Sequence, residues 1–160
     1  MSDEIRIVPA RQEDVPGILK LLEAVNMHHI PSREMPELDW RCFFVAWLGD
    51  RMAGACGYKM LNERDGKTTL MVVDPEFRKR GLGRMLQEKR MLVMLDLGAT
   101  NVTTNADIPE TIAWYKAHFG YREVGTLAKY HEFGRTDVDH WTTLNSDLLA
   151  WRRQRFGNEP

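Results

Sequence analysis

Hydrophobic and polar positions along this chain follow two periods, one typical of strands and one typical of helices. Short apolar or β-branched runs predict strands at residues 5–8, 42–48, 52–61, 68–73 and 100–104. Two further strand-like runs, residues 121–133 and 138–144, flank a polar turn at residues 134–136. Gly49, Asp50 and Arg51 separate the second run from the third, which predicts a hairpin there.

Helical periodicity predicts four helices. The first begins at residues 12–14, carries Pro16 in its first turn, and has an apolar face made of Ile18, Leu19, Leu22 and Val25. The others span about residues 84–97, 110–118 and 146–155, with Gly98 ending the second and Asp107 a candidate cap of the third. The predicted order, β-α-loop-β-β-β-α-β-α-β-β-α, is that of a mixed α/β (α+β) fold with a sheet flanked by helices.

Length and composition favour one globular domain spanning residues 1–160. Hydrophobic residues make up 43% of the 160 and charged residues 28%. No apolar run has the length of a membrane span or of a signal peptide, so we expect a cytoplasmic protein without a membrane partner.

A net charge of -1 disfavours general nucleic-acid binding. Cys42 and Cys56 are too few for a disulfide scaffold or a zinc site, so we expect buried free thiols and no metal.

Residues 72–86 are the most informative stretch. They form an apolar strand end, a proline turn, a basic loop with two glycines, and the start of a helix. The free N–H groups of a helix N-terminus attract phosphate, and Gly81 and Gly83 let a ligand approach the backbone. Four positive charges surround the glycines, on Arg78, Lys79, Arg80 and Arg84. The stretch therefore predicts a pyrophosphate-binding loop; the alternative is a plain strand-to-helix connection with a solvated basic face.

The pattern Arg78-x-x-Gly81-x-Gly83, preceded by Val-Asp-Pro-Glu-Phe, resembles the acyl-CoA-binding motif of the GCN5-related N-acetyltransferase (GNAT) superfamily. Nearly the whole chain takes part in the resemblance, with the C-terminal helix as an addition. It implies a GNAT-type, mostly antiparallel central sheet, and acetyl-CoA as cosubstrate. It also implies contacts to the pantetheine arm from the backbone of Met71, Val72 and Val73, whose side chains are equally typical of core. The pyrophosphate would be held by the loop residues Arg78, Lys79, Arg80, Gly81, Leu82, Gly83 and Arg84.

A second segment, residues 112–121, resembles the Tyr-x-x-x-Gly-Phe segment of the same family. The resemblance implies that Tyr115 protonates the departing CoA thiolate, as a phenol can at neutral pH. Tyr115 precedes Gly120 by five residues where the family usually has four, and the alternative is a core tyrosine with a satisfied hydroxyl. Asn105 loosely matches a family asparagine that contacts pantetheine; a loop-capping role is the alternative.

The general base has several candidates. Relatives often carry a glutamate early in the strand before the glycine loop, whereas residues 67–69 of this chain are Lys-Thr-Thr. By chemistry the candidates are Glu63 and the histidines His28, His29, His131 and His140, and a water chain is an alternative. The acceptor would be chosen by residues 27–39 and 130–140, whose carboxylates suggest a cationic acceptor.

Three functions are compatible with these residues. The first is an N-acetyltransferase, in which a primary amine, expected on a small molecule, attacks acetyl-CoA directly in a ternary complex. The second is a non-catalytic acyl-CoA sensor or regulatory subunit. The third, acetylation of transfer RNA, is disfavoured by the net charge. The C-terminal segment, with Leu148, Leu149 and Trp151 at apolar positions, is a candidate homodimer interface or packs on its own sheet.

Overall fold

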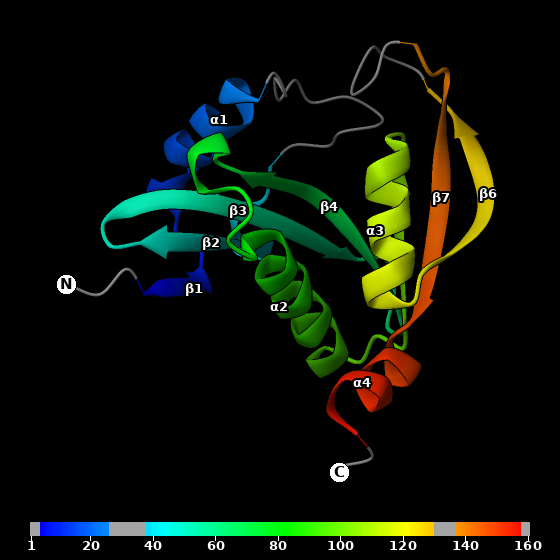
Figure 1. Ribbon diagram of the computed structural model, residues 1–160. Coiled ribbons are helices and arrows are strands. Elements are labelled where there is room, and N and C mark those ends of the chain that lie inside the picture. The colour runs from blue at the N-terminus through cyan, green and yellow to red at the C-terminus, as the bar shows by residue number, and fades with distance from the viewer. Residues whose placement is uncertain (1–3, 26–37, 130–136, 158–160) are drawn as a thin grey trace. The chain divides into compact units, whose positions relative to one another are not determined.

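The computed structural model describes residues 4–25, 38–129 and 137–157. It confirms the predicted order of elements and the mixed fold, with one seven-stranded, mostly antiparallel sheet in the strand order β1-β2-β3-β4-β5-β7-β6 (Figure 1). The strands are β1 (Ile5–Pro9), β2 (Phe43–Leu48), β3 (Arg51–Met60), β4 (Asp65–Val73), β5 (Asn101–Ala106), β6 (Arg122–Ala128) and β7 (His140–Asp147). The α-helices of the described part are α1 (Val15–Ala24), α2 (Leu82–Asp96), α3 (Pro109–Phe119) and α4 (Leu148–Phe156), with short 3-10 turns η1 (Gln12–Asp14), η2 (Trp40–Cys42) and η3 (Pro75–Phe77).

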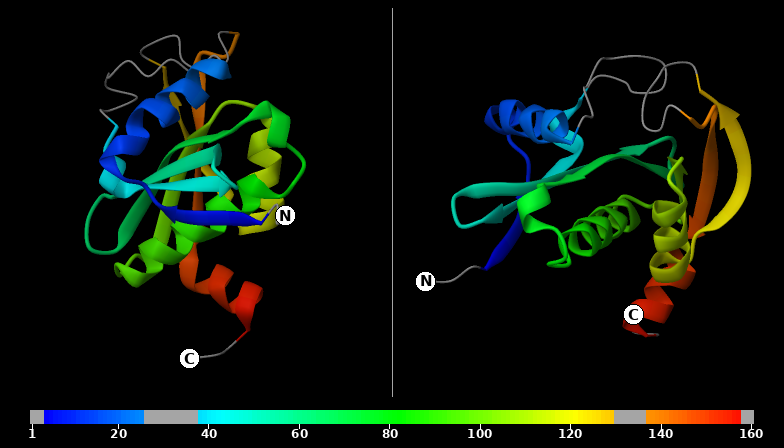
Figure 2. Two further views of the ribbon diagram at one scale, coloured as in Figure 1. Left: turned by 90° about the vertical axis from the view of Figure 1, so that its left-hand side faces the viewer. Right: turned by 45° about the horizontal axis from the view of Figure 1, so that its top comes forward.

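The chain forms two compact units. Unit 1 comprises Met1–Lys59 and Thr69–Val93, and unit 2 comprises Met60–Thr68 and Met94–Pro160. In unit 1, β2 pairs antiparallel with β1 and with β3, and α1 and α2 cover opposite faces of these strands (Figure 2). The face toward α2 holds a core of small and large apolar residues: Phe44, Ala46, Ala53, Cys56, Phe77, Leu82 and Leu86.

The apolar face of α1 differs from the prediction. Ile18 and Leu22 are buried as expected, but Leu19 is 38% exposed and the third buried position is Leu21. Positions i, i+3 and i+4 share one side of a helix, so Ile18, Leu21 and Leu22 form the true buried stripe. The assignment of Leu19 to that stripe was wrong: successive residues are about 100° apart on a helix, which places Leu19 beyond the edge of the stripe formed by the other three.

In unit 2, β5 lies between β4 and β7. The parallel ladder with β4 has three residue pairs, from Asp65 with Asn101 to Lys67 with Thr103, and the ladder with β7 is antiparallel. Helix α4, predicted as an addition, packs on this unit through Leu148 and Trp151, both buried. The Trp151 ring lies 6.4 Å from that of Phe119 in α3. The apolar positions of α4 therefore contact the sheet and helix of their own chain.

The boundary between β7 and α4 corrects the predicted helix start at residue 146. Ser146 belongs to β7, where it pairs with Val102, and α4 begins only at Leu148. The Ser146 hydroxyl is buried and donates to the carbonyl of Phe119 at 2.7 Å. The side chain of Asp147 caps the helix by accepting from the N–H of Ala150.

Asp107 does not cap α3. The N-cap is Ile108, without a side-chain hydrogen bond, and Pro109 occupies the first helical turn as expected. The carboxylate of Asp107 instead forms an ion pair with Lys129 at 2.8 Å, and both side chains are only 7% exposed. A distant lysine competes successfully for this carboxylate because both groups are withdrawn from water.

Candidate active site

The glycine loop of unit 1 has the backbone of an anion-binding turn. After η3 the chain passes through two left-handed residues, Lys79 (φ +66°) and Gly81 (φ +79°). Helix α2 begins at Leu82, two residues earlier than predicted, so Gly83 lies in its first turn and not in the loop. The N–H of Met85 donates to the carbonyl of Gly81 at 3.1 Å. The N–H groups of the first turn have no carbonyl partner within the helix. The loop therefore offers free amides and the positive end of a helix dipole.

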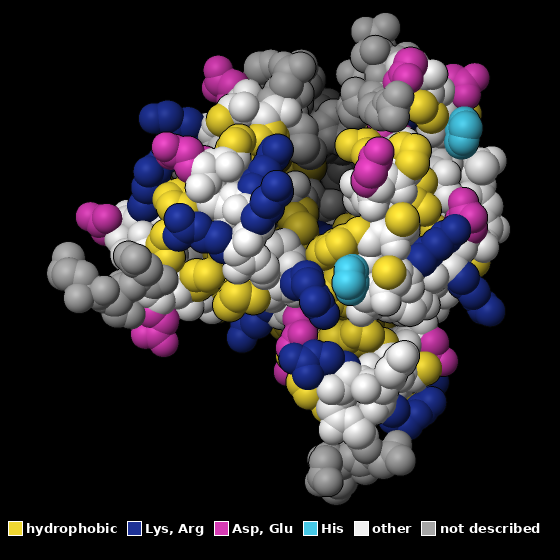
Figure 3. Space-filling view, in the orientation of Figure 1, with side chains coloured by type: hydrophobic (Ala, Val, Ile, Leu, Met, Phe, Trp, Pro, Cys, Tyr) yellow, Lys and Arg dark blue, Asp and Glu magenta, His cyan; other side chains and the backbone are white. Residues whose placement is uncertain are grey.

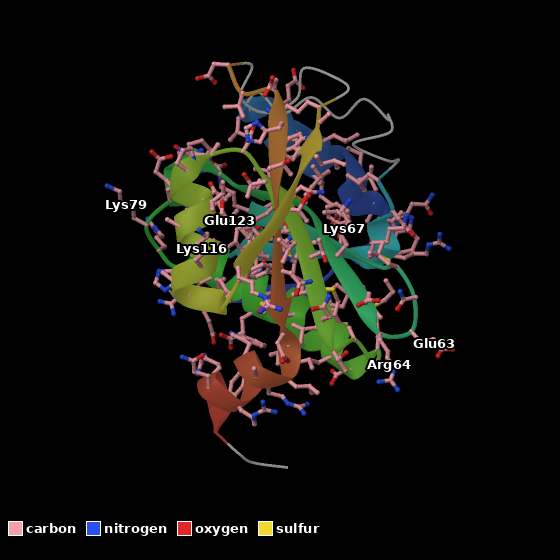
Figure 4. All side chains as sticks on the ribbon, turned by 90° about the vertical axis from the view of Figure 1, so that its right-hand side faces the viewer. Glu63, Arg64, Lys67, Lys79, Lys116 and Glu123 are labelled. Carbon is pink, nitrogen blue, oxygen red and sulfur yellow. The ribbon has the colours of Figure 1, made fainter. Side chains whose placement is uncertain are left out.

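Space and charge at the loop also suit an anion. A Cβ added at Gly81 would meet no heavy atom within 4 Å, so this glycine is needed for its backbone angle and leaves open space. All four basic side chains predicted here, Arg78, Lys79, Arg80 and Arg84, are exposed. Figure 3 shows dark-blue side chains gathered over the loop and the start of α2, and Figure 4 shows Lys79 pointing away from the fold.

Arg51, which sequence reasoning missed, supports the loop from β3. Its guanidinium pairs with the carboxylate of Glu76, approaches that of Asp74 at 3.7 Å, and lies 4.8 Å from the centre of the Phe77 ring. Arg80 approaches the same ring at 5.4 Å. Arg51 therefore offsets two negative charges at the base of a site that should attract anions. No local pattern points to Arg51, because it lies 25 residues before Glu76.

The strand before the loop presents alternate backbone groups to opposite edges. The N–H of Asp74 donates to Ala53 of β3 at 2.8 Å, and the carbonyl of Val72 also lies against β3. Because successive residues alternate, the N–H and carbonyl groups of Met71 and Val73 point to the edge away from β3. These two side chains are half-buried against the core, whereas Val72 is 4% exposed. The ladder with β5 ends at Lys67, so residues 68–73 lie outside it.

Arg90 of α2 is a second residue that the sequence analysis missed. Its side chain is fully buried. Its Nη1 donates to the carbonyls of Gly57 in β3 at 3.0 Å and of Leu70 in β4 at 3.3 Å. The sequence signal is the four-residue spacing of Leu82, Leu86 and Arg90. Residues at this spacing lie on one side of a helix, so Arg90 faces the sheet together with the two buried leucines.

Tyr115 lies in unit 2, on α3, and is 7% exposed. Its ring centre lies 4.9 Å from that of Tyr121 and 5.1 Å from that of Trp114. Gly120 ends the helix in the left-handed conformation, with its N–H donating to the carbonyl of Tyr115. The predicted acid and the glycine loop thus belong to different units, and the contacts described for each lie within its own unit.

Asn105 is on β5, opposite Thr143 of β7. Its side-chain oxygen accepts from the Thr143 hydroxyl at 2.8 Å, and two residues along the ladder Asn145 donates to the hydroxyl of Thr103 at 3.3 Å. The side chain of Asn105 therefore forms a cross-strand hydrogen bond in the sheet rather than capping the loop.

The described base candidates are both on the surface. Glu63 is exposed in the turn between β3 and β4, as Figure 4 shows. His140 is exposed at the start of β7 with its Nδ1 3.1 Å from Asp139, and this hydrogen bond holds the pKa of the Asp139 carboxyl below its usual range. His28, His29, His131 and most of the predicted acceptor segments, 27–39 and 130–140, lie outside the described residues.

The two thiols are free; Cys56 is buried as predicted, whereas Cys42 is only half-buried, contrary to the prediction. Burial raises the pKa of the Cys56 thiol to about 11 and, together with the Asp39 carboxylate, raises that of Cys42. Both therefore remain protonated at neutral pH and are poor nucleophiles. Within residues 4–25, 38–129 and 137–157 no cluster of three or more metal-ligating side chains occurs. No helix of that same part is long and apolar enough to cross a bilayer.

The chain is similar to known proteins in sequence and in fold. Residues 15–121 match the model of the acetyltransferase (GNAT) family. A comparison with curated proteins finds no match. Among solved structures, Ard1 from Thermoplasma volcanium superposes with a TM-score of 0.73 at 18% identity, covering 89% of this chain and 97% of its own.

Two further structures share the fold. The ribosomal-protein-S18-alanine N-acetyltransferase from Escherichia coli has a TM-score of 0.71 at 17% identity, covering 91% of this chain and 94% of its own. N-acetylglutamate synthase from Neisseria gonorrhoeae, complexed with coenzyme A and N-acetyl-glutamate, has a TM-score of 0.68 at 19% identity, over 92% of this chain and 36% of its own. The family model matches residues 15–121, about two thirds of the chain, and the fold agrees with that match. This chain therefore belongs to the GNAT acetyltransferase family.

Proposed function

We propose that this protein is an N-acetyltransferase that moves the acetyl group of acetyl-CoA to a primary amine on a small molecule, acting as a single domain over residues 1–160. Family membership implies acetyl transfer from acetyl-CoA in general. The observation that carries the finer proposal is the loop with left-handed Lys79 and Gly81, which opens α2 with free amides amid four exposed basic side chains. That combination suits the pyrophosphate of a CoA thioester.

The cosubstrate would lie along two adjoining pieces of unit 1. The loop residues from Arg78 to Arg84 would hold the pyrophosphate with backbone amides and cationic side chains. The N–H and carbonyl groups of Met71 and Val73, which point away from β3, would bind the amide groups of the pantetheine arm. Val72 would contribute packing, because its own polar groups point toward β3. Asn105, bonded to Thr143, would help to shape the part of the sheet that belongs to unit 2.

The reaction would be a direct transfer. The neutral amine nitrogen attacks the thioester carbonyl carbon, the C–S bond breaks, and the thiolate leaves with a proton from the phenol of Tyr115. The attacking nitrogen loses its own proton to a base or to water. The high pKa of the Cys56 thiol and the raised pKa of Cys42 support direct attack over an acetyl-cysteine intermediate.

A small-molecule acceptor is supported by the fold shared with N-acetylglutamate synthase, whose structure contains N-acetyl-glutamate. The fold shared with the S18-alanine N-acetyltransferase makes a protein amine the competing acceptor. An acyl-CoA sensor is a second candidate, favoured by the absence of a carboxylate at residues 67–69. The cytoplasmic location and a homodimer remain predictions.

The first test is calorimetric titration of the wild-type protein and of Gly81→Glu with acetyl-CoA, followed by thiol release with a panel of amines and peptides. Micromolar binding that the substitution abolishes, with turnover of a small amine, supports the proposal. Binding without turnover on any amine favours the sensor. A folded wild-type protein that does not bind acetyl-CoA overturns both.

A further inference from the structure

The buried guanidinium of Arg90 acts directly on the strand proposed to bind the pantetheine arm. Its Nη1 approaches the carbonyl of Leu70 at 3.3 Å and that of Gly57 at 3.0 Å, while its Nε donates to Gln87 at 2.6 Å. Burying a guanidinium is costly, and an apolar side chain of similar volume often gives equal or greater stability. The position of Arg90 under two strand carbonyls therefore points to a geometric role in addition to packing.

Peptide planarity connects Arg90 to Met71. The carbonyl of Leu70 and the N–H of Met71 belong to one planar trans peptide group, so they point in opposite directions and turn together. The Leu70 carbonyl is held on the side of β3 by Arg90, in line with the alternation set by Asp74. The N–H of Met71 is thereby fixed toward the opposite edge, where the cosubstrate is proposed to bind.

Thr69 and Gly57 indicate that backbone position is tightly set here. A Cβ at Gly57 would collide with the hydroxyl of Thr69 and would come within 2.6 Å of the Phe43 ring. The Thr69 hydroxyl oxygen is buried and has no hydrogen-bond partner among the described residues. An orphaned buried hydroxyl lowers stability. The segment thus retains an unfavourable local arrangement directly before the peptide that Arg90 holds.

We propose that Arg90 is a positioning residue for the cosubstrate. By holding the Leu70–Met71 peptide it aims the Met71 N–H at the pantetheine arm, without contacting the ligand itself. This inference rests on the proposed function. The inference goes beyond the proposed function because it separates two parts of cosubstrate binding. The glycine loop holds the nucleotide end, and Arg90 determines how β4 binds the pantetheine arm.

The test uses two ligands and three forms of the full-length protein. Calorimetry measures the affinity of the wild type, Arg90→Lys and Arg90→Met for CoA and for adenosine 3′-phosphate 5′-diphosphate, the part of CoA that lacks pantetheine. We expect Arg90→Met to bind CoA about tenfold more weakly than the wild type, with nucleotide affinity unchanged. Arg90→Lys, which keeps a donor, should recover part of the loss. Should Arg90→Met fail to fold, Arg90→Lys decides by the same comparison.

Ile18→Ala is the control for general destabilisation, because Ile18 is fully buried in the same unit but lies on α1. It should lower the melting temperature without changing either affinity. Equal affinities of wild type and Arg90 variants for CoA overturn the inference while leaving the proposed function intact. The inference is also overturned if the Arg90 variants lose affinity for CoA and for the nucleotide equally and Ile18→Ala shows the same losses. A wild type that binds neither ligand overturns the proposed function itself.

Discussion

The pyrophosphate site proposed in unit 1 consists of consecutive residues, the loop 78–81 and the first turn of α2 at 82–84, with four exposed basic side chains and the amides of a helix start. Tyr115 of unit 2 lies instead in an aromatic cluster, next to the rings of Trp114 and Tyr121. Phe119, which contacts Trp114, also contacts Trp151 of α4. The loop depends on backbone angles and charge, whereas the tyrosine depends on packing. Substitutions should therefore harm the two regions in different ways: the first through affinity, the second through turnover or stability.

The largest effect is expected for Gly81→Glu, which should weaken acetyl-CoA binding by roughly 1,000-fold. The substitution places an L side chain at φ +79° and a negative charge among the amides. Calorimetry measures the change. Gly49→Glu is the matched control, because Gly49 has φ +64° and is equally open within 4 Å, but lies in the turn between β2 and β3. Similar losses in both variants would mean that strain, and not an anion site, is responsible.

The buried pair of Lys129 and Asp107 tests packing in unit 2. Lys129→Met should lower the free energy of unfolding by about 3 kcal/mol, because it leaves Asp107 buried without this partner charge. Urea denaturation measures it. Lys116→Met removes an exposed pair with Glu123, visible in Figure 4, and should cost at most about 0.5 kcal/mol. Neither should alter CoA affinity; a weakened CoA complex in Lys129→Met would contradict the separation of the two regions.

Tyr115→Phe should lower kcat by roughly 100-fold and leave the KM for acetyl-CoA unchanged, if the phenol protonates the thiolate. Steady-state kinetics with the amine found by screening provides both constants. Tyr121→Phe is the control, since its ring lies 4.9 Å from that of Tyr115 and is similarly buried. An unchanged kcat in Tyr115→Phe would mean that Tyr115 is a core residue and does not protonate the thiolate.

The smallest effect is expected for single loop cations. Arg84→Gln should weaken acetyl-CoA binding about threefold at low salt, and the difference should shrink at high salt, because exposed charges are screened. Titrations at two ionic strengths measure this. Arg152→Gln, an exposed arginine of α4 in unit 2, should change nothing. A salt-independent loss in Arg84→Gln would point to a specific contact instead.

Helix α2 carries exposed cations at its start and a buried guanidinium, that of Arg90, further along. The cations at its start are exposed, so each would contribute little to binding of the proposed cosubstrate. The guanidinium of Arg90 is buried, and its Nη1 donates to one carbonyl in β3 and one in β4, at 3.0 and 3.3 Å. The loop cations were identified from the sequence pattern, whereas the hydrogen-bond partners of Arg90 are known only from the structure.

The sequence alone predicted the order of elements, the basic glycine loop before α2, and the glycine that follows the end of that helix, Gly98. These features arise from neighbouring residues, through backbone angles that glycine favours and amides that a helix start leaves free. Three other features depend on tertiary contacts: Ser146 extends β7, Asp107 pairs with Lys129, and Arg90 holds Gly57 and Leu70. Those partners lie 20 or more residues apart, and buried polar groups select among distant partners only once the chain has folded.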